Sequence, residues 1–345
     1  MDTLMLNVVE ILPEAADTVT ILLQRADQRP LEYQAGQFLT FLFKSHNTPS
    51  ADQDPLSVRE LRRSYSLSST PGVDPLPAIT VKRVTNGEIS RYLLDHLRVG
   101  DQLTSLLPSG RFTLDNNPPL LFFIGAGSGM TPIFSLIKQA LQNMPDTRVI
   151  LLSQHNDHES VLFKRQLAEL ATKHTERFNW INLLSNKQGR LNNWWLEELL
   201  GKLLLNLPAP LFYLCGPPAF MRMAQFTLRV MGFKDSRIKK ENFTVEYVPP
   251  PPLIDPTPRH ITIRAGDRTY QYQSAWPSTI LQAGLDQHIP LPYSCKGGRC
   301  STCVAKCLSG QVKMSVNEVL TEKDLQEGLI LTCVGYAQTD VELQY

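Results

Sequence analysis

The sequence lacks any apolar run that approaches the roughly 18 residues of a membrane-spanning helix. Met1–Thr20 also lacks the basic start and apolar core of a secretory signal, and it carries Glu10, Glu14 and Asp17. An excess of either charge is missing too, because 34 Lys and Arg stand against 33 Asp and Glu. These absences argue against a protein that binds nucleic acids or membrane surfaces. We expect a soluble, cytoplasmic protein that is not inserted in a membrane.

Cysteine is scarce, with six residues in a chain of 345. That number is too small for a disulfide scaffold in a protein of this length. Five of the six nevertheless fall between Cys295 and Cys333, which indicates metal chemistry in a reducing compartment. Because the chain is too long for one hydrophobic core, we expect two or three domains.

Three regions of the chain differ in their hydrophobic pattern. Residues 1–115 alternate short β-rich runs with turn residues, which predicts an antiparallel barrel or sandwich. In residues 116–247 the apolar strand Leu120–Ile124 runs through a glycine-rich turn into a helix, which predicts an α/β domain with a parallel sheet. Residues 248–258 contain four consecutive prolines and predict an extended linker before a third domain at 259–345.

Smaller elements are also expected within these regions. The helix after the glycine-rich turn is predicted to begin with Thr131 as its N-cap and Pro132 in its first turn. The remaining predictions are strands at Trp180–Ser185 and Leu211–Cys215, a helix from Ala219, and a hairpin around Gly266-Asp267.

The clustered cysteines have the spacing of a plant-type [2Fe-2S] site, which needs four thiolates. The spacing is C-x4-C-x2-C with a distant fourth member: Cys295, Cys300, Cys303 and Cys333. Gly297 and Gly298 let the backbone approach the cluster and donate N–H groups to it. A structural zinc site, the alternative, normally pairs two C-x2-C units. Cys307 is interpreted as a small buried strand residue rather than a ligand.

Two segments of the first region carry residues suited to bind a phosphate group and to stack on an aromatic ring of a ligand. Arg63 and Tyr65 alternate along an expected strand, so a cation and a ring lie side by side, with Ser66 next to them. Downstream, Ile79–Arg83 adds cations, and Gly87 leads into an expected helix at Ser90–Leu97, whose N-terminus suits an anion.

Two turns of the second region suit a dinucleotide. The turn from Gly125 to Pro132 joins a strand to a helix, although Met130 stands where the third glycine of G-x-G-x-x-G is expected. The turn Cys215-Gly216-Pro217-Pro218 opens at the carboxyl edge of the sheet, where α/β domains bind ligands. A buried strand residue is the alternative interpretation of Cys215.

Taken together, R-x-Y-S, G-x-G-x-G-x-x-P, C-G-P-P and C-x4-C-x2-C…C resemble the ferredoxin-NADP reductase superfamily, in the branch with its own C-terminal ferredoxin domain. Within that branch the likeness is greatest to reductase components of phenylacetyl-CoA oxygenase systems. The resemblance covers essentially the whole chain. It implies an FAD-binding β-barrel, an NAD(P)-binding α/β domain and a β-grasp ferredoxin-like α+β domain, with FAD favoured over FMN.

The resemblance also implies roles for individual residues. Arg63 would bind the flavin pyrophosphate, Tyr65 would pack on the isoalloxazine ring, and Ser66 would hydrogen-bond near flavin N5. The other implied flavin contacts are Val81, Arg83, Gly87 and Ser90, with Phe243 over the second flavin face. The implied nicotinamide dinucleotide contacts are Gly125, Gly127, Gly129, Thr131, Cys215, Gly216 and Pro217. Ser66, Cys215 and Glu241 are the implied catalytic residues.

These parts predict an NAD(P)H-dependent reductase. A hydride carries two electrons and the cluster accepts one, so FAD must stand between them. The external acceptor is expected to be an oxygenase or hydroxylase component. The alternatives are a non-catalytic protein stabilised by zinc, or a redox sensor. Ser153–Asn156 and Ser185–Lys187 offer neither an Arg for a 2′-phosphate nor an obvious acid for the ribose, and we expect NADH slightly ahead of NADPH.

Overall fold

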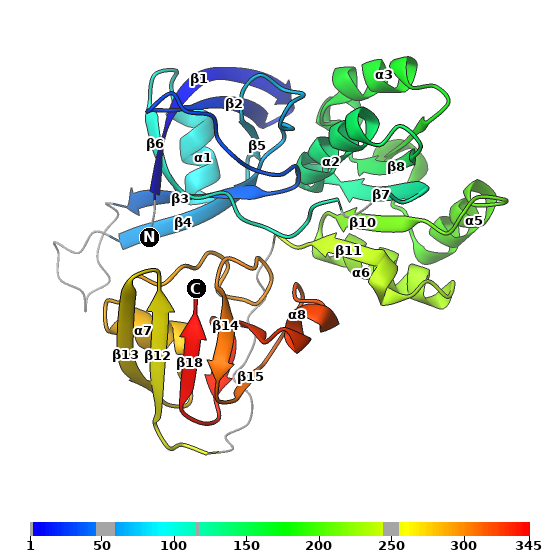
Figure 1. Cartoon of the computed structure of the whole chain (residues 1–345). Coiled ribbons are helices and arrows are strands. Elements are labelled where there is room, and N and C mark those ends of the chain that lie inside the picture. Colours follow the sequence, from blue (N-terminus) through cyan, green and yellow to red (C-terminus); the bar gives the residue numbers. More distant parts are fainter. Residues whose placement is uncertain (1–2, 46–58, 115–116, 244–254) are drawn as a thin grey trace. The chain divides into compact units, whose positions relative to one another are not determined.

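A computed structural model describes residues 3–45, 59–114, 117–243 and 255–345. Contacts divide the chain into two compact units (Figure 1). The larger unit comprises Asp2–Pro108 and Phe112–Phe243, and the smaller comprises Met1, Ser109–Arg111 and Thr244–Tyr345. Most of the predicted linker at 248–258 lies outside the described residues, and the domain boundaries stay predictions.

The larger unit begins with an antiparallel barrel. Its strands are β1 (Thr3–Ala15), β2 (Thr18–Arg25), β3 (Phe38–Ser45), β4 (Arg59–Ser66), β5 (Ala78–Lys82) and β6 (Gln102–Leu106), in the order β4-β3-β6-β1-β2-β5. A bridge between Leu67 and Ile79 joins the segment after β4 to β5, so the sheet closes on itself. Alternate residues such as Leu6, Ile21 and Leu39 fill its core. Helix α1 (Glu88–Asp95) follows β5. The predicted antiparallel barrel is confirmed.

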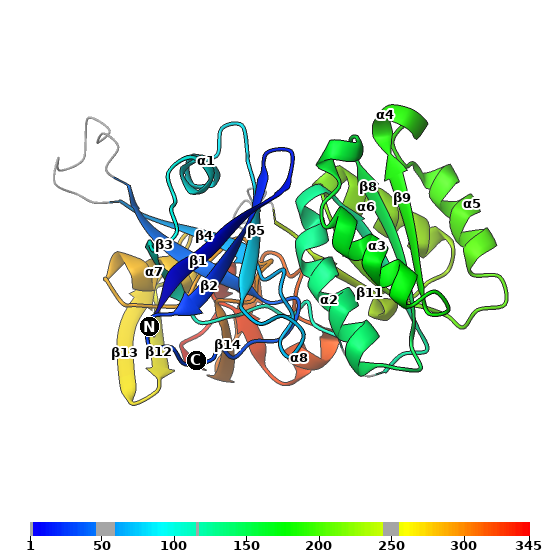
Figure 2. The ribbon, with the colours of Figure 1, turned by 90° about the horizontal axis from the view of Figure 1, so that it is seen from above.

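The second part of this unit is a parallel sheet with helices on both faces (Figure 2). Its strands are β7 (Leu120–Ala126), β8 (Arg148–His155), β9 (Phe178–Leu184), β10 (Leu211–Cys215) and β11 (Ile238–Glu241), in the order β11-β10-β7-β8-β9. Helices α2 (Met130–Asn143) and α3 (Lys164–Lys173) pack on one face, and α5 (Asn193–Leu203) and α6 (Pro218–Val230) pack on the other. The strand order reverses between β7 and β10, where α/β sheets bind ligands.

The smaller unit has a five-stranded mixed sheet in the order β13-β12-β18-β14-β16. Its elements are β12 (Arg259–Ala265), β13 (Arg268–Ser274), α7 (Ile280–Asp286), β14 (Val304–Ser309), β15 (Val312–Met314), α8 (Glu322–Gln326), β16 (Leu329–Leu331), β17 (Gly335–Ala337) and β18 (Val341–Gln344). Strand β18 lies in the middle of the sheet, parallel to β12 and antiparallel to β14. The predicted hairpin around Gly266-Asp267 is confirmed.

One helix start differs from its prediction. Thr131 was expected to cap α2, but Gly129 holds the N-cap position and Thr131 lies inside the first turn. Its hydroxyl donates to the Ser128 carbonyl oxygen at 2.7 Å. The short 3-10 turn Gly127–Gly129 precedes the helix, so the chain begins to coil earlier than a polar cap residue would indicate.

Candidate functional site

The glycine-rich turn after β7 lies against the end of β10. A Cβ atom on Gly129 would come within 2.2 Å of the Cys215 carbonyl oxygen, so only glycine lets these two turns meet. Cys215 is paired in register with Gly125 on one side and with Glu241 on the other. The structure thus brings the G-x-G-x-G turn, the C-G-P-P turn and the end of β11 to one edge of the sheet.

The Cys215 thiol is completely buried. Burial raises its pKa well above the usual value, and the neighbouring Glu241 carboxylate raises it further. The side chain is therefore a neutral thiol at physiological pH, not a nucleophile. The alternative interpretation, a buried strand residue, describes its packing correctly.

A cleft of about 400 Å³ opens at the same edge of the sheet. Of the predicted residues, Gly127 and Pro217 line it, whereas Gly129 and Thr131 are buried. The other lining residues come from the ends of β5, β7 and β8, the 3-10 turn His158–Ser160, the segment from the end of β9 to just after α4, and the first half of α6: Lys82, Ala126, Gln154, His155, Asn156, Ser160, Ser185, Arg190, Leu191, Ala219, Phe220 and Met223.

Two cations line this cleft: Lys82 belongs to the cationic segment Ile79–Arg83 noted in the sequence, whereas Arg190 was not singled out there. Lys82 ends β5 of the barrel, and Arg190 follows the short helix α4 (Ser185–Gln188). Arg190 lies three residues beyond Lys187, where the segment Ser185–Lys187 that follows the third parallel strand ends. No local pattern marks Arg190, because its place in the cleft depends on how the loop after α4 folds back to β8.

Strand β4 carries the Arg63, Tyr65 and Ser66 set. The Tyr65 ring is half-buried and lies 6.1 Å from the Phe41 ring on β3, and burial raises the pKa of its phenol to about 12. Ser66 is buried and pairs in register with Phe38. The Arg63 guanidinium is exposed and donates to the Arg62 carbonyl oxygen at 2.7 Å.

The segment from β5 to α1 holds the remaining predicted flavin residues. The Val81 side chain is buried in the barrel core, so the part of this residue left for a ligand is its backbone. Arg83 forms ion pairs with Asp95 at 2.5 Å and with Asp17 at 3.5 Å. The Ser90 hydroxyl accepts the Val84 N–H at 3.1 Å and so organises the loop. The N-cap residue, Gly87, gives α1 no side-chain cap, which leaves this helix end suited to an anion.

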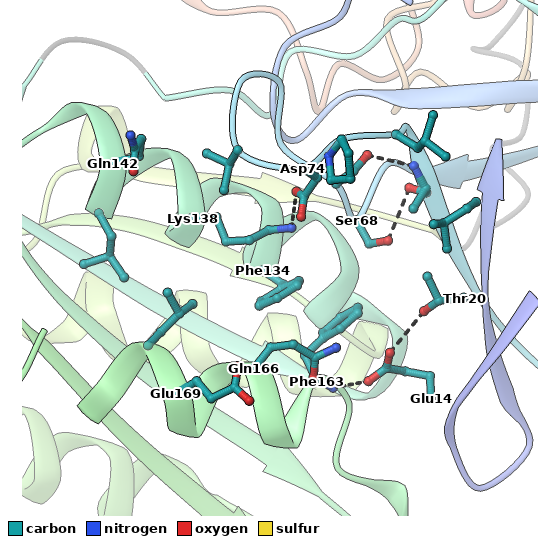
Figure 3. Close-up of a pocket in the computed structure, with 18 of the residues that line it drawn as sticks. Glu14, Thr20, Ser68, Asp74, Phe134, Lys138, Gln142, Phe163, Gln166 and Glu169 are labelled. Atoms are coloured by element: carbon teal, nitrogen blue, oxygen red, sulfur yellow. Dashed lines mark hydrogen bonds and ion pairs between the residues drawn. The ribbon is translucent and has the colours of Figure 1, made fainter. Parts of the chain in front are cut away.

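The barrel and the parallel-sheet domain are tied together by direct contacts behind these sites (Figure 3). Thr70, just after β4, donates its hydroxyl to the Ser135 carbonyl oxygen of α2 at 2.8 Å. Asp74 forms an ion pair with Lys138, whose side chain is only 8% exposed. The Lys138 ammonium also lies 4.3 Å from the centre of the Phe134 ring.

A second cavity, of about 420 Å³, lies at this interface. Figure 3 shows the stacked rings of Phe134 and Phe163, whose centroids are 4.2 Å apart. Glu14, from β1, accepts hydrogen bonds from the Phe163 N–H at 2.8 Å and from the Thr20 hydroxyl at 3.1 Å. These polar groups satisfy one another, so the cavity is part of the contact that fixes the two sites relative to each other.

In the smaller unit the four predicted ligands converge. Hydrogen bonds from the Cys300 and Cys333 thiols lower the pKa of Cys295, and one from Cys333 lowers the pKa of Cys303. The Cys295 sulfur also accepts the Gly297 N–H at 3.3 Å. Such a set of soft sulfur donors, with a backbone N–H directed at one of them, fits an iron-sulfur cluster.

A buried hydroxyl joins two of these cysteines. The Thr332 hydroxyl, next to Cys333, donates to the Cys303 carbonyl oxygen at 3.0 Å. The Tyr345 phenol lies 2.7 Å from the Thr332 oxygen and is placed to donate to it. Neither residue was singled out from the sequence, because their contacts join segments far apart in the chain.

Two further predicted residues lie apart from these clusters. Cys307 is on β14, as expected, but it is half-buried rather than buried, and its thiol donates to the Ser309 carbonyl oxygen at 3.3 Å. Phe243, just after β11, is 44% exposed.

Comparisons with known proteins agree with both units. The oxidoreductase NAD-binding domain family matches residues 123–225, and the 2Fe-2S iron-sulfur cluster binding domain family matches residues 263–338. The latter decides against the zinc alternative for the cysteine loop. In the part of the chain that the structure describes, no helix is long and apolar enough to cross a membrane.

Two curated relatives span nearly the whole chain. The ferredoxin reductase component of 3-ketosteroid-9-alpha-monooxygenase from Mycobacterium tuberculosis is 34% identical over 92% of this chain and 86% of its own. One component of the 1,2-phenylacetyl-CoA epoxidase from Escherichia coli is 30% identical over 95% of this chain and 93% of its own. Among solved structures, phthalate dioxygenase reductase shares the fold, with a TM-score of 0.60 at 20% identity over 99% of this chain and 98% of its own.

Proposed function

The chain belongs to the ferredoxin-NADP reductase superfamily, in the branch that carries its own [2Fe-2S] ferredoxin domain, and from this we propose that it passes electrons from NAD(P)H to a separate oxygenase component. FAD and the cluster are the intermediate carriers. The observation that carries the proposal is the combination of a dinucleotide cleft and the R-x-Y-S strand in one compact unit with four converging thiols in the other.

When bound, FAD would accept a hydride from NAD(P)H and release its electrons singly to the cluster. The chain supplies binding and orientation for this chemistry. The exposed Arg63 guanidinium and the uncapped start of α1 would bind the flavin pyrophosphate, and the half-buried Tyr65 ring would lie against the isoalloxazine ring. Arg83 already pairs with the carboxylates of Asp17 and Asp95. It would therefore hold the loop before α1 in place in addition to any contact with phosphate.

On the nucleotide side, Cys215 would sit beside the nicotinamide ring as a buried neutral thiol, which supports the C-G-P-P turn without placing a charge there. Glu241 lies beside it in the sheet register and Phe243 follows two residues later. Gly129 would act indirectly, by letting the two turns close against each other. The Thr70 and Asp74 contacts with α2 would keep the nicotinamide and flavin sites at a constant distance, as hydride transfer requires.

The acceptor is proposed to be an oxygenase or hydroxylase component. The two relatives serve different oxygenases by name, a ketosteroid monooxygenase and a phenylacetyl-CoA epoxidase, so similarity supports the class of acceptor and no single substrate. A cytoplasmic location is proposed as well, because the cysteines that the structure describes are all unpaired thiols and their chemistry needs a reducing compartment.

The test uses the purified full-length protein. We expect a flavin and an iron-sulfur absorption spectrum, extraction of FAD rather than FMN, and reduction of cytochrome c by NADH or NADPH. A colourless zinc protein, or one that binds flavin but transfers no electrons to any acceptor, would refute the proposal. Sustained turnover with an acceptor would argue against a sensor that merely changes its redox state.

A further inference from the structure

The dinucleotide cleft described above has an unbalanced charge. Lys82 and Arg190 line it, whereas none of the described residues in its wall is Asp or Glu. Burial lowers the pKa of His155, and the charge of Lys82 lowers it further, so this imidazole is neutral near pH 7. The positive charge of the cleft therefore comes from two side chains, one on the barrel and one on the parallel-sheet domain.

The carboxylate best placed to select an unphosphorylated ribose is occupied elsewhere. Asp157 follows β8, the second strand of the parallel sheet, where an acid that binds the ribose hydroxyls is expected. Its side chain instead accepts the N–H groups of Glu159 and Ser160 and caps the 3-10 turn His158–Ser160. Asp157 is not among the residues that line the cleft.

Arg190, in contrast, is held at the cleft. Helix α4 ends at Gln188, and the φ of +82° at the next residue, Gly189, turns the chain back toward β8. The side chain of the buried Gln154 binds the backbone on both sides of Arg190. The Gln154 amide nitrogen donates to the Gly189 carbonyl oxygen, and the Gln154 amide oxygen accepts the Leu191 N–H, both at 3.3 Å. Leu191 is buried in the core, so the loop is anchored on both sides of the arginine.

We propose that this cleft selects the 2′-phosphorylated dinucleotide, NADPH, through the Arg190 guanidinium, and that Gln154 is the positioning residue for the loop that carries it. Ser185, just after β9, adds a hydroxyl to the same wall. Among the described residues no carboxylate forms an ion pair with Arg190, so its charge is available to a phosphate. The inference rests on the proposed function, and it reverses the slight sequence-based preference for NADH, which considered residues only as far as Lys187.

Direct binding tests the inference without electron transfer. Adenosine 2′,5′-bisphosphate and adenosine 5′-monophosphate differ only in the 2′-phosphate, and their dissociation constants can be measured by calorimetry on the full-length protein. We expect the bisphosphate to bind at least about tenfold more tightly, as a charge-assisted contact to phosphate provides. Arg190→Ala should remove most of this difference, and Gln154→Ala should remove part of it.

Lys187→Ala is the matched control. It also removes one positive charge close to α4, but Lys187 lies 3.3 Å from His158 and is not among the lining residues. We expect the affinity ratio of Lys187→Ala to equal that of the unmodified protein. Equal affinity for the two nucleotides in the unmodified protein, or equal losses in Arg190→Ala and Lys187→Ala, would overturn the proposal.

Steady-state kinetics give a second reading. The ratio of kcat/KM for NADPH to that for NADH should exceed one, and it should fall about tenfold or more in Arg190→Ala. A ratio below one in the unmodified protein would also overturn the inference. If neither nucleotide reduces the flavin, the proposed function fails, while the calorimetric comparison still decides whether the cleft recognises a 2′-phosphate.

Discussion

Cys333 and Cys307 offer the sharpest contrast at the scale of single residues. Cys333 interacts with Cys295 and Cys303, whereas the Cys307 thiol donates to the Ser309 carbonyl oxygen. We therefore predict that Cys333→Ser loses the normal cluster spectrum but retains flavin reduction by NAD(P)H, because the residues of the proposed flavin site belong to the other compact unit. Cys307→Ser should retain both. Visible absorption and electron paramagnetic resonance distinguish the two, and loss of the cluster in Cys307→Ser alone would contradict the ligand assignment.

Tyr345 gives a second prediction at this scale. Its phenol is placed to donate to the Thr332 hydroxyl, which in turn holds the Cys303 carbonyl oxygen. Tyr345→Phe removes one buried hydrogen bond and should lower the stability of the smaller unit by about 1 kcal/mol. The measurement is the urea concentration at which cluster absorbance disappears. Tyr270→Phe, on β13, is the control, and an equal shift in both variants would rule out a specific role for the Thr332 contact.

Single residues were predictable from the sequence where their partners are close in the chain. Cys295, Cys300 and Cys303 lie in one loop, so their spacing alone indicates a common metal. Arg190 and Tyr345 were not predictable, because each acts through a residue of a distant strand or loop, Gln154 and Thr332 respectively. Val81 is a different case: the resemblance implies a ligand contact, and because its side chain belongs to the barrel core, such a contact would use its backbone.

At the scale of elements, the turn between β7 and α2 depends on the absence of a side chain. Gly129→Ala would place a Cβ atom 2.2 Å from the Cys215 carbonyl oxygen, and neither backbone can move without disturbing the sheet. We predict a loss of about 1–3 kcal/mol in the free energy of unfolding, together with weaker binding of adenosine 2′,5′-bisphosphate. Urea unfolding and calorimetry measure the two effects.

Gly201→Ala provides the matched control. Gly201 lies within α5, and a Cβ atom there meets nothing within 4 Å. Because glycine is unfavourable inside a helix, this variant should be unchanged or more stable by up to about 1 kcal/mol. If Gly129→Ala behaved like Gly201→Ala, the close approach of the two turns would be unimportant for the site.

Elements were predicted well where hydrophobic period and turn residues agree, as in the antiparallel barrel and the hairpin of β12 and β13. The start of α2 was misplaced because a polar cap residue was sought, and Thr131 has the right chemistry in the wrong position. The tight packing of this turn on β10, which decides the true start, is a tertiary contact that no local pattern contains.

At the scale of the whole molecule, the barrel and the parallel-sheet domain, which would hold the proposed flavin and nicotinamide sites, are joined by the ion pair of Asp74 with Lys138. Asp74 is 29% exposed and Lys138 is 8% exposed, so the two halves of this ion pair are not equivalent. Asp74→Ala leaves a buried ammonium without its partner and should cost about 3 kcal/mol of stability. Lys138→Met should cost less, because the methionine can pack on Phe134 and the remaining carboxylate reaches water.

The double variant tests this asymmetry. Replacing both residues leaves no buried ammonium without a partner. The double variant Asp74→Ala with Lys138→Met should therefore lose less free energy of unfolding than Asp74→Ala alone. Asp235→Ala, which breaks an exposed pair with Arg229, is the control and should change stability by less than about 1 kcal/mol. Equal effects for all single variants in urea unfolding would show that the interface pair contributes no more than a surface pair.

Strand β18 has a consequence for how the protein is made. It is the middle strand of the sheet in the smaller unit, and it follows all four cluster cysteines in the chain. The two halves of that sheet, β13-β12 on one side and β14-β16 on the other, are therefore unjoined until β18 docks between them, although all four thiols are already part of the folding unit. Metal insertion must either follow the docking of β18 or act on a unit whose sheet is still in two parts, so the order of cluster delivery and strand docking becomes part of this protein's maturation.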